Sequence, residues 1–338
     1  MKSFIAFFRL IRLPNLLIIA LTQYAIRFGL MFPLLNSSGF ELAMSEQNFF
    51  LLVLVTVMVA AAGYIINDYF DTKIDRVNKP KRVIVGKLIK RRVAMGAHIV
   101  ISTLAIIISV YIAWYINHLW LSLIQIGSVM ALWYYSINFK RRMLVGNFII
   151  ATLTALVPVS AGLYEFIELK NHLLEELQHY ASIYNESNPV YAGVFFKDVL
   201  TNIALLIIGY AIFAFLLTMV REIIKDIEDY EGDLAENCKT LPIVVGKNKA
   251  NHTTIVIAVI TFILLLFVQY TQLTSSEIVS ALYFSVFLQF PLIMLIIKLF
   301  GAKKKNDYAW ASRLTKLIML FGILYTSVIY FQEFYLNV

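Results

Sequence analysis

Two stretches of the chain concentrate aspartates at helical spacing. In the first, residues 67–75, Asn67, Asp71 and Asp75 recur every four positions and Asp68 precedes Asp71 by three. On a helix these side chains would point in roughly one direction, where like charges repel each other. The arrangement is favourable when a divalent cation lies between the carboxylates, and Mg²⁺ binds such oxygen ligands together with water and phosphate. The stretch therefore predicts a magnesium site.

The second acidic stretch, residues 221–233, repeats the spacing of the first. When the chain is aligned with itself so that Asp68 falls on Asp226, two further aspartate pairs and one lysine pair coincide: Asp71 with Asp229, Asp75 with Asp233, and Lys81 with Lys239. Each stretch follows an apolar run, so the match indicates an internal duplication. The candidate catalytic residues are Asn67, Asp68, Asp71, Asp75, Asp226, Asp229 and Asp233.

Basic residues begin directly after the first acidic stretch, at Arg76, and continue through Lys81 and Arg82. Carboxylates that hold metal ions beside bases that hold phosphate could clamp a diphosphate from two sides. A solvated loop that only sets membrane topology would explain the positive charge but not its interleaving with the acids. We therefore predict metal-assisted cleavage of a diphosphate ester. The organic fragment would depart as a cation, shielded from water by apolar and aromatic side chains.

The composition places both stretches in a membrane protein. The 338 residues are 60% hydrophobic and 15% charged, whereas soluble domains are nearer half apolar and a quarter charged. The apolar runs are long enough for helical spans, and we predict nine, at about 14–35, 48–67, 93–115, 118–137, 144–164, 200–221, 251–271, 277–299 and 314–335.

The basic residues predict how these spans are oriented. With the N-terminus in the cytoplasm, all Lys and Arg except Arg27, Lys170 and Lys197 lie in cytoplasmic segments or at the adjoining helix ends. The prediction is a multi-pass protein of the plasma or inner membrane with its C-terminus outside and both aspartate stretches on the cytoplasmic side. We expect Arg27, deep in the first span, to snorkel to the outer interface or to pair with an acid.

Several classes of site and partner are excluded by the same counts. The net charge of +8 is explained by loops that face anionic lipid and a phosphorylated substrate, so we expect no nucleic-acid partner. The single cysteine, Cys238, cannot form a disulfide framework or a thiolate metal site, and the five histidines are scattered.

The predicted domain organisation is one integral membrane domain over residues 1–338. Residues 68–92 and 222–250 are the predicted cytoplasmic active-site loops, and residues 165–199 form a predicted surface helix or cap on the outer side. The last three spans carry almost no polar residues, so we expect them to act as scaffold and hydrophobic wall.

Three further side chains are candidates for the wall of a cavity. Asn147 lies in a predicted span, and an asparagine there usually faces the helix bundle. Tyr135 belongs to an aromatic group that forms either an interfacial belt or the wall of a lipid-substrate tunnel. Asn15 could face a central cavity together with Arg9 or Arg12, or those arginines could serve only as topology determinants.

With these motifs the sequence resembles the UbiA superfamily of intramembrane prenyltransferases, in which nine transmembrane helices surround a central cavity. The family motifs Asn-Asp-x-x-Asp-x-x-x-Asp and Asp-x-x-x-Asp correspond to residues 67–75 and 229–233. The family loop that often reads Asn-x-Pro-x-Arg-Pro corresponds to residues 78–82, followed here by Val83.

The resemblance implies a role for individual residues. It implies that Mg²⁺ and a prenyl diphosphate are bound by Asn67, Asp71, Asp75, Asp229 and Asp233. It implies diphosphate contacts from Arg76, Lys81, Arg82 and Lys140, and a position on the cavity wall for Asn15. Lys239, which aligns with Lys81, is a further candidate for a diphosphate contact.

The second stretch is most similar to the branch that prenylates geranylgeranylglyceryl phosphate, and it also resembles the homogentisate branch. The implied function is Mg²⁺-dependent transfer of a prenyl group to a lipophilic acceptor. Geranylgeranyl is the expected prenyl group. The alternative acceptor is an aromatic quinone precursor of the 4-hydroxybenzoate, dihydroxynaphthoate or homogentisate type. A transporter would place its charges near the bilayer midplane, and a lipid-binding protein would have no reason to keep so many aspartates.

Overall fold

The structure, a computed structural model, describes residues 2–78, 80, 83–172 and 189–335. Within that part of the chain, nine helical segments are long and apolar enough to cross a membrane: Leu13–Ser37, Glu46–Phe70, Arg91–Tyr115, Leu119–Ile137, Val145–Asn171, Gly193–Glu228, Lys247–Thr274, Ile278–Phe300 and Lys305–Tyr335. Each overlaps one of the spans predicted from the sequence, so the predicted number and order of spans are confirmed. The protein is a multi-pass integral membrane protein.

The spans are built from long helices and from pairs of helices joined end to end. In chain order the elements of the first half are α1 (Lys2–Leu10), α2 (Leu13–Tyr24), η1 (Ala25–Met31), α3 (Phe32–Ser37), α4 (Glu46–Phe70), α5 (Thr72–Asn78), α6 (Arg91–Tyr115), η2 (Leu119–Leu121), α7 (Ser122–Ile137), η3 (Phe139–Arg141) and α8 (Val145–Asn171). Those of the second half are α10 (Pro189–Glu228), α11 (Tyr230–Ala235), α12 (Leu241–Val245), α13 (Lys247–Thr274), α14 (Ile278–Tyr283), η4 (Phe284–Gln289), α15 (Phe290–Phe300) and α16 (Lys305–Tyr335).

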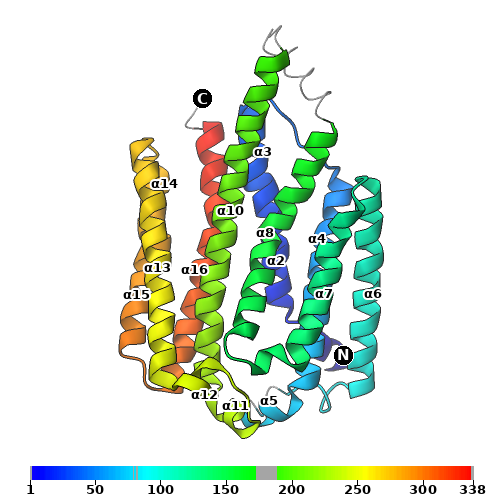
Figure 1. Ribbon diagram of the computed structural model, residues 1–338, viewed down its shortest axis with the longest axis vertical. Helices are drawn as coiled ribbons and strands as arrows, with labels where there is room; N and C mark the ends of the chain where they lie inside the picture. Colours follow the sequence, from blue (N-terminus) through cyan, green and yellow to red (C-terminus); the bar gives the residue numbers. More distant parts are fainter. Residues whose placement is uncertain (1, 79, 81–82, 173–188, 336–338) are drawn as a thin grey trace.

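The helices α4 and α10 occupy central positions in the bundle. Helix α4 packs against α2, α6 and α7, whereas α10 packs against α8, α13 and α16. Both end at the same end of the bundle, beside the short helices α5, α11 and α12 (Figure 1). We call this the motif end, because both aspartate stretches lie there. The start of the chain also lies at the motif end and α16 finishes at the opposite end, as an odd number of spans requires.

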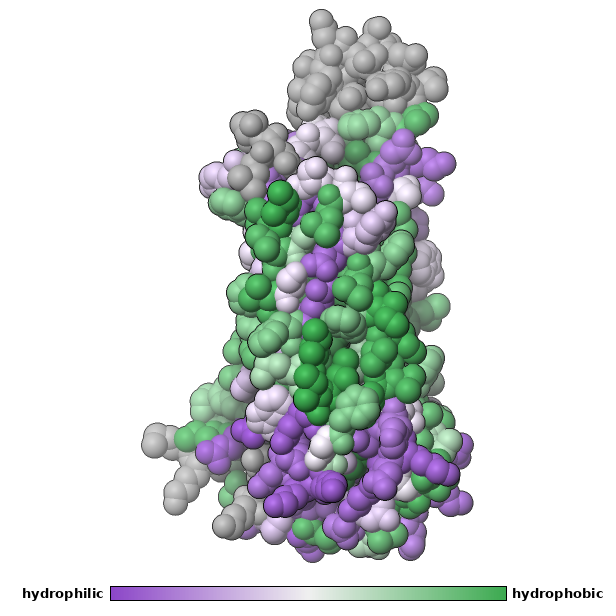
Figure 2. All heavy atoms as spheres, turned by 90° about the vertical axis from the view of Figure 1, so that its left-hand side faces the viewer, coloured by the Kyte–Doolittle hydropathy of each residue, from purple (hydrophilic) through white to green (hydrophobic). Residues whose placement is uncertain are grey.

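The surface has the polarity of a membrane protein. Figure 2 shows apolar side chains over the middle of the face formed by α13 to α15 and polar side chains gathered at the motif end. Many large apolar side chains, such as Phe267, Ile297 and Phe300, are exposed there. Exposed apolar area of this extent is favourable in lipid and unfavourable in water.

Two spans contain a π-helical segment directly before a proline. Segment η1 precedes Pro33, at the start of α3, and η4 precedes Pro291, at the start of α15. Proline lacks the amide N–H and its ring clashes with the preceding helical turn, so a wider turn before it keeps the helix continuous. Both spans therefore continue through the proline without a break.

The prediction that the last three spans carry almost no polar residues is wrong. A buried chain of hydrogen bonds connects α13, α14 and α16: Gln272 Nε2 donates to the Tyr325 hydroxyl (3.0 Å), which donates to Ser280 Oγ (2.9 Å), which donates to Gln332 Oε1 (2.6 Å). Polar side chains are tolerated in these spans because they satisfy one another across the helices.

The predicted outer segment 165–199 is shorter than expected. Helix α8 continues to Asn171 and α10 already begins at Pro189, while residues 173–188 lie outside the described part of the chain. The extension of α8 has an electrostatic reason. Glu165 is fully buried, accepts hydrogen bonds from the backbone N–H groups of Ala43 (2.7 Å) and Met44 (2.9 Å), and pairs with Arg27.

Arg27 therefore takes the second of its two predicted positions, inside the bundle. Its Nη1 lies 3.3 Å from Glu165 Oε2, its Nη2 donates to the Met44 carbonyl, and its guanidinium lies 4.4 Å from the centre of the Phe49 ring. A buried ion pair is weak evidence for net stability, but removal of one partner leaves an uncompensated buried charge.

We expect Arg27→Met to destabilise the protein by about 3–5 kcal/mol, the range measured when one partner of a buried ion pair is removed. Arg27 does not line the cavity described below, so the folded fraction should keep its activity. Thermal unfolding in detergent measures the effect, and Arg313→Met, at an exposed position of α16, is the matched control. Loss of activity without loss of stability would contradict this assignment.

Candidate active site

The first aspartate stretch lies on the wall of a cavity of about 820 Å³, part of whose lining belongs to the motif end. Asn67 and Asp68 belong to the last turn of α4, Asp71 caps that helix, and Asp75 lies in α5; all four line the cavity. The chain bends between α4 and α5, so the i, i+4 spacing continues over a break in the helix. The carboxylates therefore surround one opening.

The second stretch reaches the same cavity from α10. Asp226 lies in the last turn of α10 and Asp229 forms the N-cap of α11, and both line the wall. Helices α4 and α10 thus bring the two stretches to one opening although more than 150 residues separate them. The geometry agrees with the expectation that both stretches face a common mouth.

Lys140 places a cation against the first stretch. It lies in η3, pairs with the Asp71 carboxylate and lies 3.4 Å from Asn67 Oδ1. Burial alone would lower the pKa of Lys140, but the adjacent Asp71 carboxylate and Tyr135 hold it above the ordinary value. The lysine is therefore charged at neutral pH, and it lies on the cavity wall, where it is available to bind an anion.

The candidates for the cavity wall take two kinds of position. Tyr135 and Asn15 line the cavity. Asn147 is not among the lining residues; its Nδ2 donates to Asp226 Oδ2 (2.8 Å), so it orients that carboxylate from behind.

Asp233 differs from the other aspartates of the two motifs. It is buried in α11, accepts a hydrogen bond from Thr240 Oγ1 (3.2 Å) and is not among the lining residues. Burial raises the pKa of Asp233 to about 6, although Lys140 and the hydrogen bond from Thr240 oppose the shift. Its role as a metal ligand stays a prediction.

The remaining predicted diphosphate contacts are not on the wall. Arg76 and Lys239 are exposed and do not line the cavity, and the Lys239 backbone N–H donates to the Arg141 carbonyl (2.8 Å). Lys81 and Arg82 lie outside the described residues.

A residue that the sequence reasoning missed joins the two stretches. The Asn78 side chain donates from Nδ2 to the Asp229 carbonyl (3.0 Å) and accepts at Oδ1 from the Gly232 backbone N–H (2.9 Å). This pair of hydrogen bonds, which we call the Asn78 clasp, connects α5 to α11. The asparagine that opens the Asn-x-Pro-x-Arg segment was the available signal for it.

Sequence reasoning also missed a group of charged side chains on the cavity wall. Arg221, Glu222 and Lys225 come from α10 and Lys316 comes from α16. They share the wall with Arg9 and Arg12, the arginines that were expected either to face the cavity or to serve only as topology determinants. The signal was present: Lys316 lies inside the last predicted span, where a charged residue is expensive unless it faces the bundle interior.

The sequence and the fold are also similar to those of known proteins. The sequence profile described as the UbiA prenyltransferase family matches residues 16–324, which is most of the chain. The chain belongs to the UbiA prenyltransferase family. It is therefore a membrane prenyltransferase, and the transporter and lipid-binding alternatives are set aside.

Individual relatives of this UbiA protein carry a more specific name. A digeranylgeranylglyceryl phosphate synthase of Saccharolobus solfataricus is 30% identical over 317 residues, which cover 93% of this chain and 94% of that protein. A synthase of the same name from Thermococcus kodakarensis is 29% identical over 213 residues, which cover 63% of this chain and 62% of that protein. The second match thus spans less than two thirds of its relative.

Solved structures show the same fold. A structure described as a digeranylgeranylglyceryl phosphate synthase in membranes aligns with a TM-score of 0.57 and 23% identity, over 97% of this chain and 100% of that one. A UbiA homolog from Archaeoglobus fulgidus bound to DMAPP and Mg²⁺ aligns with a TM-score of 0.53 and 18% identity, over 96% of this chain and 99% of that one.

The donor set of the UbiA motifs can be tested against Mg²⁺. Across the described part of the chain, no three His, Cys, Asp or Glu side chains are grouped closely enough to hold a metal ion by themselves. Mg²⁺ does not need such a group, because it usually binds through one or two carboxylates and completes its shell with water and substrate phosphates. The wall carboxylates therefore fit a Mg²⁺ ion that is shared with a diphosphate.

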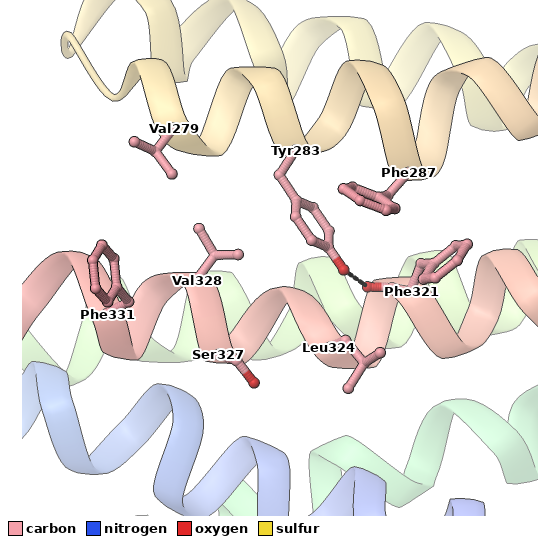
Figure 3. A pocket seen from close by; sticks show the side chains of 8 residues that line it. All are labelled: Val279, Tyr283, Phe287, Phe321, Leu324, Ser327, Val328 and Phe331. Carbon is pink, nitrogen blue, oxygen red and sulfur yellow. Dashed lines mark hydrogen bonds between the residues drawn. The ribbon is translucent and has the colours of Figure 1, made fainter.

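A second hollow, of about 400 Å³, lies between α14–η4 and α16 (Figure 3). It is lined by apolar and aromatic side chains and by Ser327, and the Tyr283 hydroxyl donates to the Phe321 carbonyl (2.8 Å). No charged side chain lines it, so it offers nothing to a phosphorylated substrate.

The Asn78 clasp gives a testable prediction. A Cβ added at Gly232 would collide with the Asn78 side-chain amide, so we expect Gly232→Ala to break both hydrogen bonds, each worth about 0.5–1.5 kcal/mol. The expected result is a lower unfolding temperature in detergent together with reduced turnover, because α5 and α11 no longer hold the aspartates in register.

Gly209→Ala is the matched control, since a Cβ added there meets nothing within 4 Å. It should be neutral or stabilising by about 0.5–1 kcal/mol, the ordinary gain from alanine over glycine in a helix. Equal behaviour of the two variants would contradict a structural role for the clasp.

Proposed function

We propose that this protein transfers a geranylgeranyl group from geranylgeranyl diphosphate to geranylgeranylglyceryl phosphate. The observation that carries the proposal is that both aspartate stretches line one cavity, with Lys140 beside Asp71. Family membership supplies the reaction class, and the named relatives support the choice of acceptor. An aromatic acceptor is the alternative outcome of the test below.

We assign Mg²⁺ to the motif residues Asn67, Asp71, Asp75, Asp229 and Asp233. When bound, Mg²⁺ would neutralise the leaving diphosphate. The Archaeoglobus homolog bound to DMAPP and Mg²⁺ supports this assignment. The remaining carboxylates have different tasks in this proposal: Asp68 holds Arg12 through a 2.9 Å ion pair, and Asp226 is oriented by Asn147.

The side chains of the wall carry the rest of the reaction. Lys140 holds the diphosphate, and contacts from the loop residues Arg76, Lys81, Arg82 and Lys239 stay a prediction. The allylic C–O bond breaks and its electron pair leaves with the diphosphate. A hydroxyl oxygen of the acceptor then forms a new C–O bond to the allylic carbon, and its proton passes to the released diphosphate.

The apolar part of the wall accommodates the chains of both lipids. Residues deeper in the cavity are mostly apolar, among them Ile19, Val59, Leu132, Leu153 and Val157. Such a lining excludes water, which would otherwise capture the allylic cation. Tyr64 and Tyr135, near the charged end, add aromatic faces that stabilise positive charge.

We further propose that the motif end faces the cytoplasm, with the N-terminus inside and the C-terminus outside. Support comes from the concentration of Lys and Arg at the motif end and from the positions of the two ends of the chain (Figure 1). This orientation gives both phosphorylated substrates access from the cytoplasm and the adjacent lipid leaflet.

Purified protein in detergent should be offered geranylgeranyl diphosphate with geranylgeranylglyceryl phosphate, 4-hydroxybenzoate or homogentisate, each with and without EDTA. We expect the diether phosphate as product, no turnover in EDTA, and recovery when Mg²⁺ is added back. Product from an aromatic acid alone would replace the proposed acceptor, and turnover that is indifferent to EDTA would count against the metal assignment.

The motif carboxylates give a second prediction. Asp71→Asn and Asp229→Asn keep the side-chain volume but remove a charge, so each should lower turnover about a hundredfold or more, as expected when several kcal/mol of charge stabilisation are lost. Both variants should remain folded, because each relieves repulsion between neighbouring carboxylates.

Asp198→Asn is the matched control, at an exposed position near the opposite end of α10. It should leave product formation, measured by mass spectrometry, unchanged. A stable and fully active Asp71→Asn, Asp229→Asn double variant would contradict the assignment of these two carboxylates to Mg²⁺.

A further inference from the structure

Five cationic side chains gather on the cavity wall beside the first aspartate stretch, from parts of the chain that are far apart in sequence. Arg9 and Arg12 flank the turn before α2, Arg221 and Lys225 come from the last part of α10, and Lys316 comes from α16. Arg12 and Arg221 are the charged neighbours of Lys316. The proposed reaction places the donor diphosphate at Lys140, so these five cationic side chains have no role in binding the donor.

The carboxylates near the group offset only part of its charge. Glu222 Oε1 is shared by Arg221 Nη1 (2.7 Å) and Lys225 Nζ (2.8 Å), and Asp68 pairs with Arg12 (2.9 Å). Lys316 Nζ donates instead to a neutral acceptor, Asn15 Oδ1 (2.6 Å). This part of the wall, with five cations and the two carboxylates Asp68 and Glu222, therefore carries an excess of positive charge that an anion bound there would compensate.

Two buried donors on the same wall are not used within the described part of the chain. Arg221 Nε and Thr218 Oγ1 are buried and have no hydrogen-bond partner there, and both residues line the cavity. Thr218 lies one turn before Arg221 on α10, so the two donors belong to one strip of the wall. Buried donors are nearly always hydrogen-bonded, which indicates an acceptor that enters with a ligand.

We propose that Thr218, Arg221, Lys225 and Lys316, together with Arg12, form a subsite for the phosphate monoester of the lipid acceptor. A phosphate monoester carries close to two negative charges at neutral pH and three acceptor oxygens, which match several cations and two additional donors. The carboxylate of an aromatic acid has one charge and two oxygens, and it would leave part of the group uncompensated. The inference rests on the proposed function and names what recognises its acceptor.

The position of the subsite suits two phosphorylated substrates in one cavity. Asp68 pairs with Arg12 of the subsite (2.9 Å) and Asp71 pairs with Lys140, so carboxylates of the first aspartate stretch contact both cationic groups. One anion would bind on each side of these carboxylates. Glu222 holds Arg221 and Lys225 in place before the acceptor arrives, which lowers the entropy that binding must overcome.

The test measures binding in the absence of donor and Mg²⁺, so that it does not depend on turnover. The full-length protein in detergent is titrated with geranylgeranylglyceryl phosphate and with geranylgeranylglycerol, the same lipid without its phosphate. Lys316→Met should weaken binding of the phosphorylated lipid about tenfold to a hundredfold, the range expected for a lost charge-assisted hydrogen bond, and leave the alcohol unchanged. Lys316→Arg should restore most of the affinity.

Lys303→Met is the matched control, because Lys303 is exposed near the start of α16 and does not line the cavity. It should bind both lipids like the wild type. The unfolding temperature of each variant shows whether it is folded, and if Lys316→Met does not fold, Lys225→Met replaces it, with the same expected loss for the phosphorylated lipid alone.

Three results would overturn the subsite. The first is that Lys316→Met weakens the binding of both lipids equally, and the second is that it raises the KM for geranylgeranyl diphosphate and leaves the acceptor KM unchanged. The third is that inorganic phosphate displaces the phosphorylated lipid at equal concentration. The last result would identify free phosphate as the ligand. Failure of the proposed function is distinct from these results. If the wild type binds the phosphorylated lipid selectively but does not prenylate it, the subsite stands and the proposed reaction does not.

Discussion

Two groups of carboxylates that repel each other are held at one opening of a helical bundle, and most of the molecule is organised by this requirement. Inside a membrane protein such a group is stable only near cations and at a helix end, where the side chains reach water. The ends of α4 and α10 supply the location, Lys140 supplies a cation beside Asp71, and the Asn78 clasp fixes α5 against α11. The remaining repulsion favours the binding of a divalent cation with its diphosphate.

The same requirement explains how the remaining helices are arranged. The helices α4 and α10 carry the charged ends, and each packs against partner helices, α6 and α7 around the first and α13 and α16 around the second. Polar side chains elsewhere are satisfied locally, by the pair of Arg27 with Glu165 and by the hydrogen-bonded chain through Tyr325. The charged side chains of the two aspartate stretches therefore face the cavity, whereas Arg27 and Glu165 neutralise each other inside the bundle.

The sequence alone predicts the span count, the span order and the two acidic stretches, because these depend on local hydropathy and on spacing along one helix. It could not predict which distant residues share a wall. Lys316 and Arg221 meet only because α16 packs against α10, and Asn78 meets Gly232 only because α5 lies against α11. Arg27 shows the limit most clearly: its charge was visible in the first span, but the choice between snorkelling and pairing depended on Glu165, more than 130 residues away.

The charge distribution along the wall also bears on how one cavity can hold two anionic lipids. Two unit charges roughly 8 Å apart repel by about 2 kcal/mol at an effective dielectric constant of 20, and a diphosphate beside a phosphate multiplies that cost. A single cationic patch would draw both head groups to the same place and separate the reacting atoms. In the proposed reaction the diphosphate binds at Lys140, which pairs with Asp71, and the acceptor phosphate binds at Lys316 and Arg221, so each head group has its own partner. In this proposal the two isoprenoid chains lie together along the apolar part of the cavity wall. The acceptor hydroxyl then approaches the allylic carbon between the bound diphosphate and the bound phosphate.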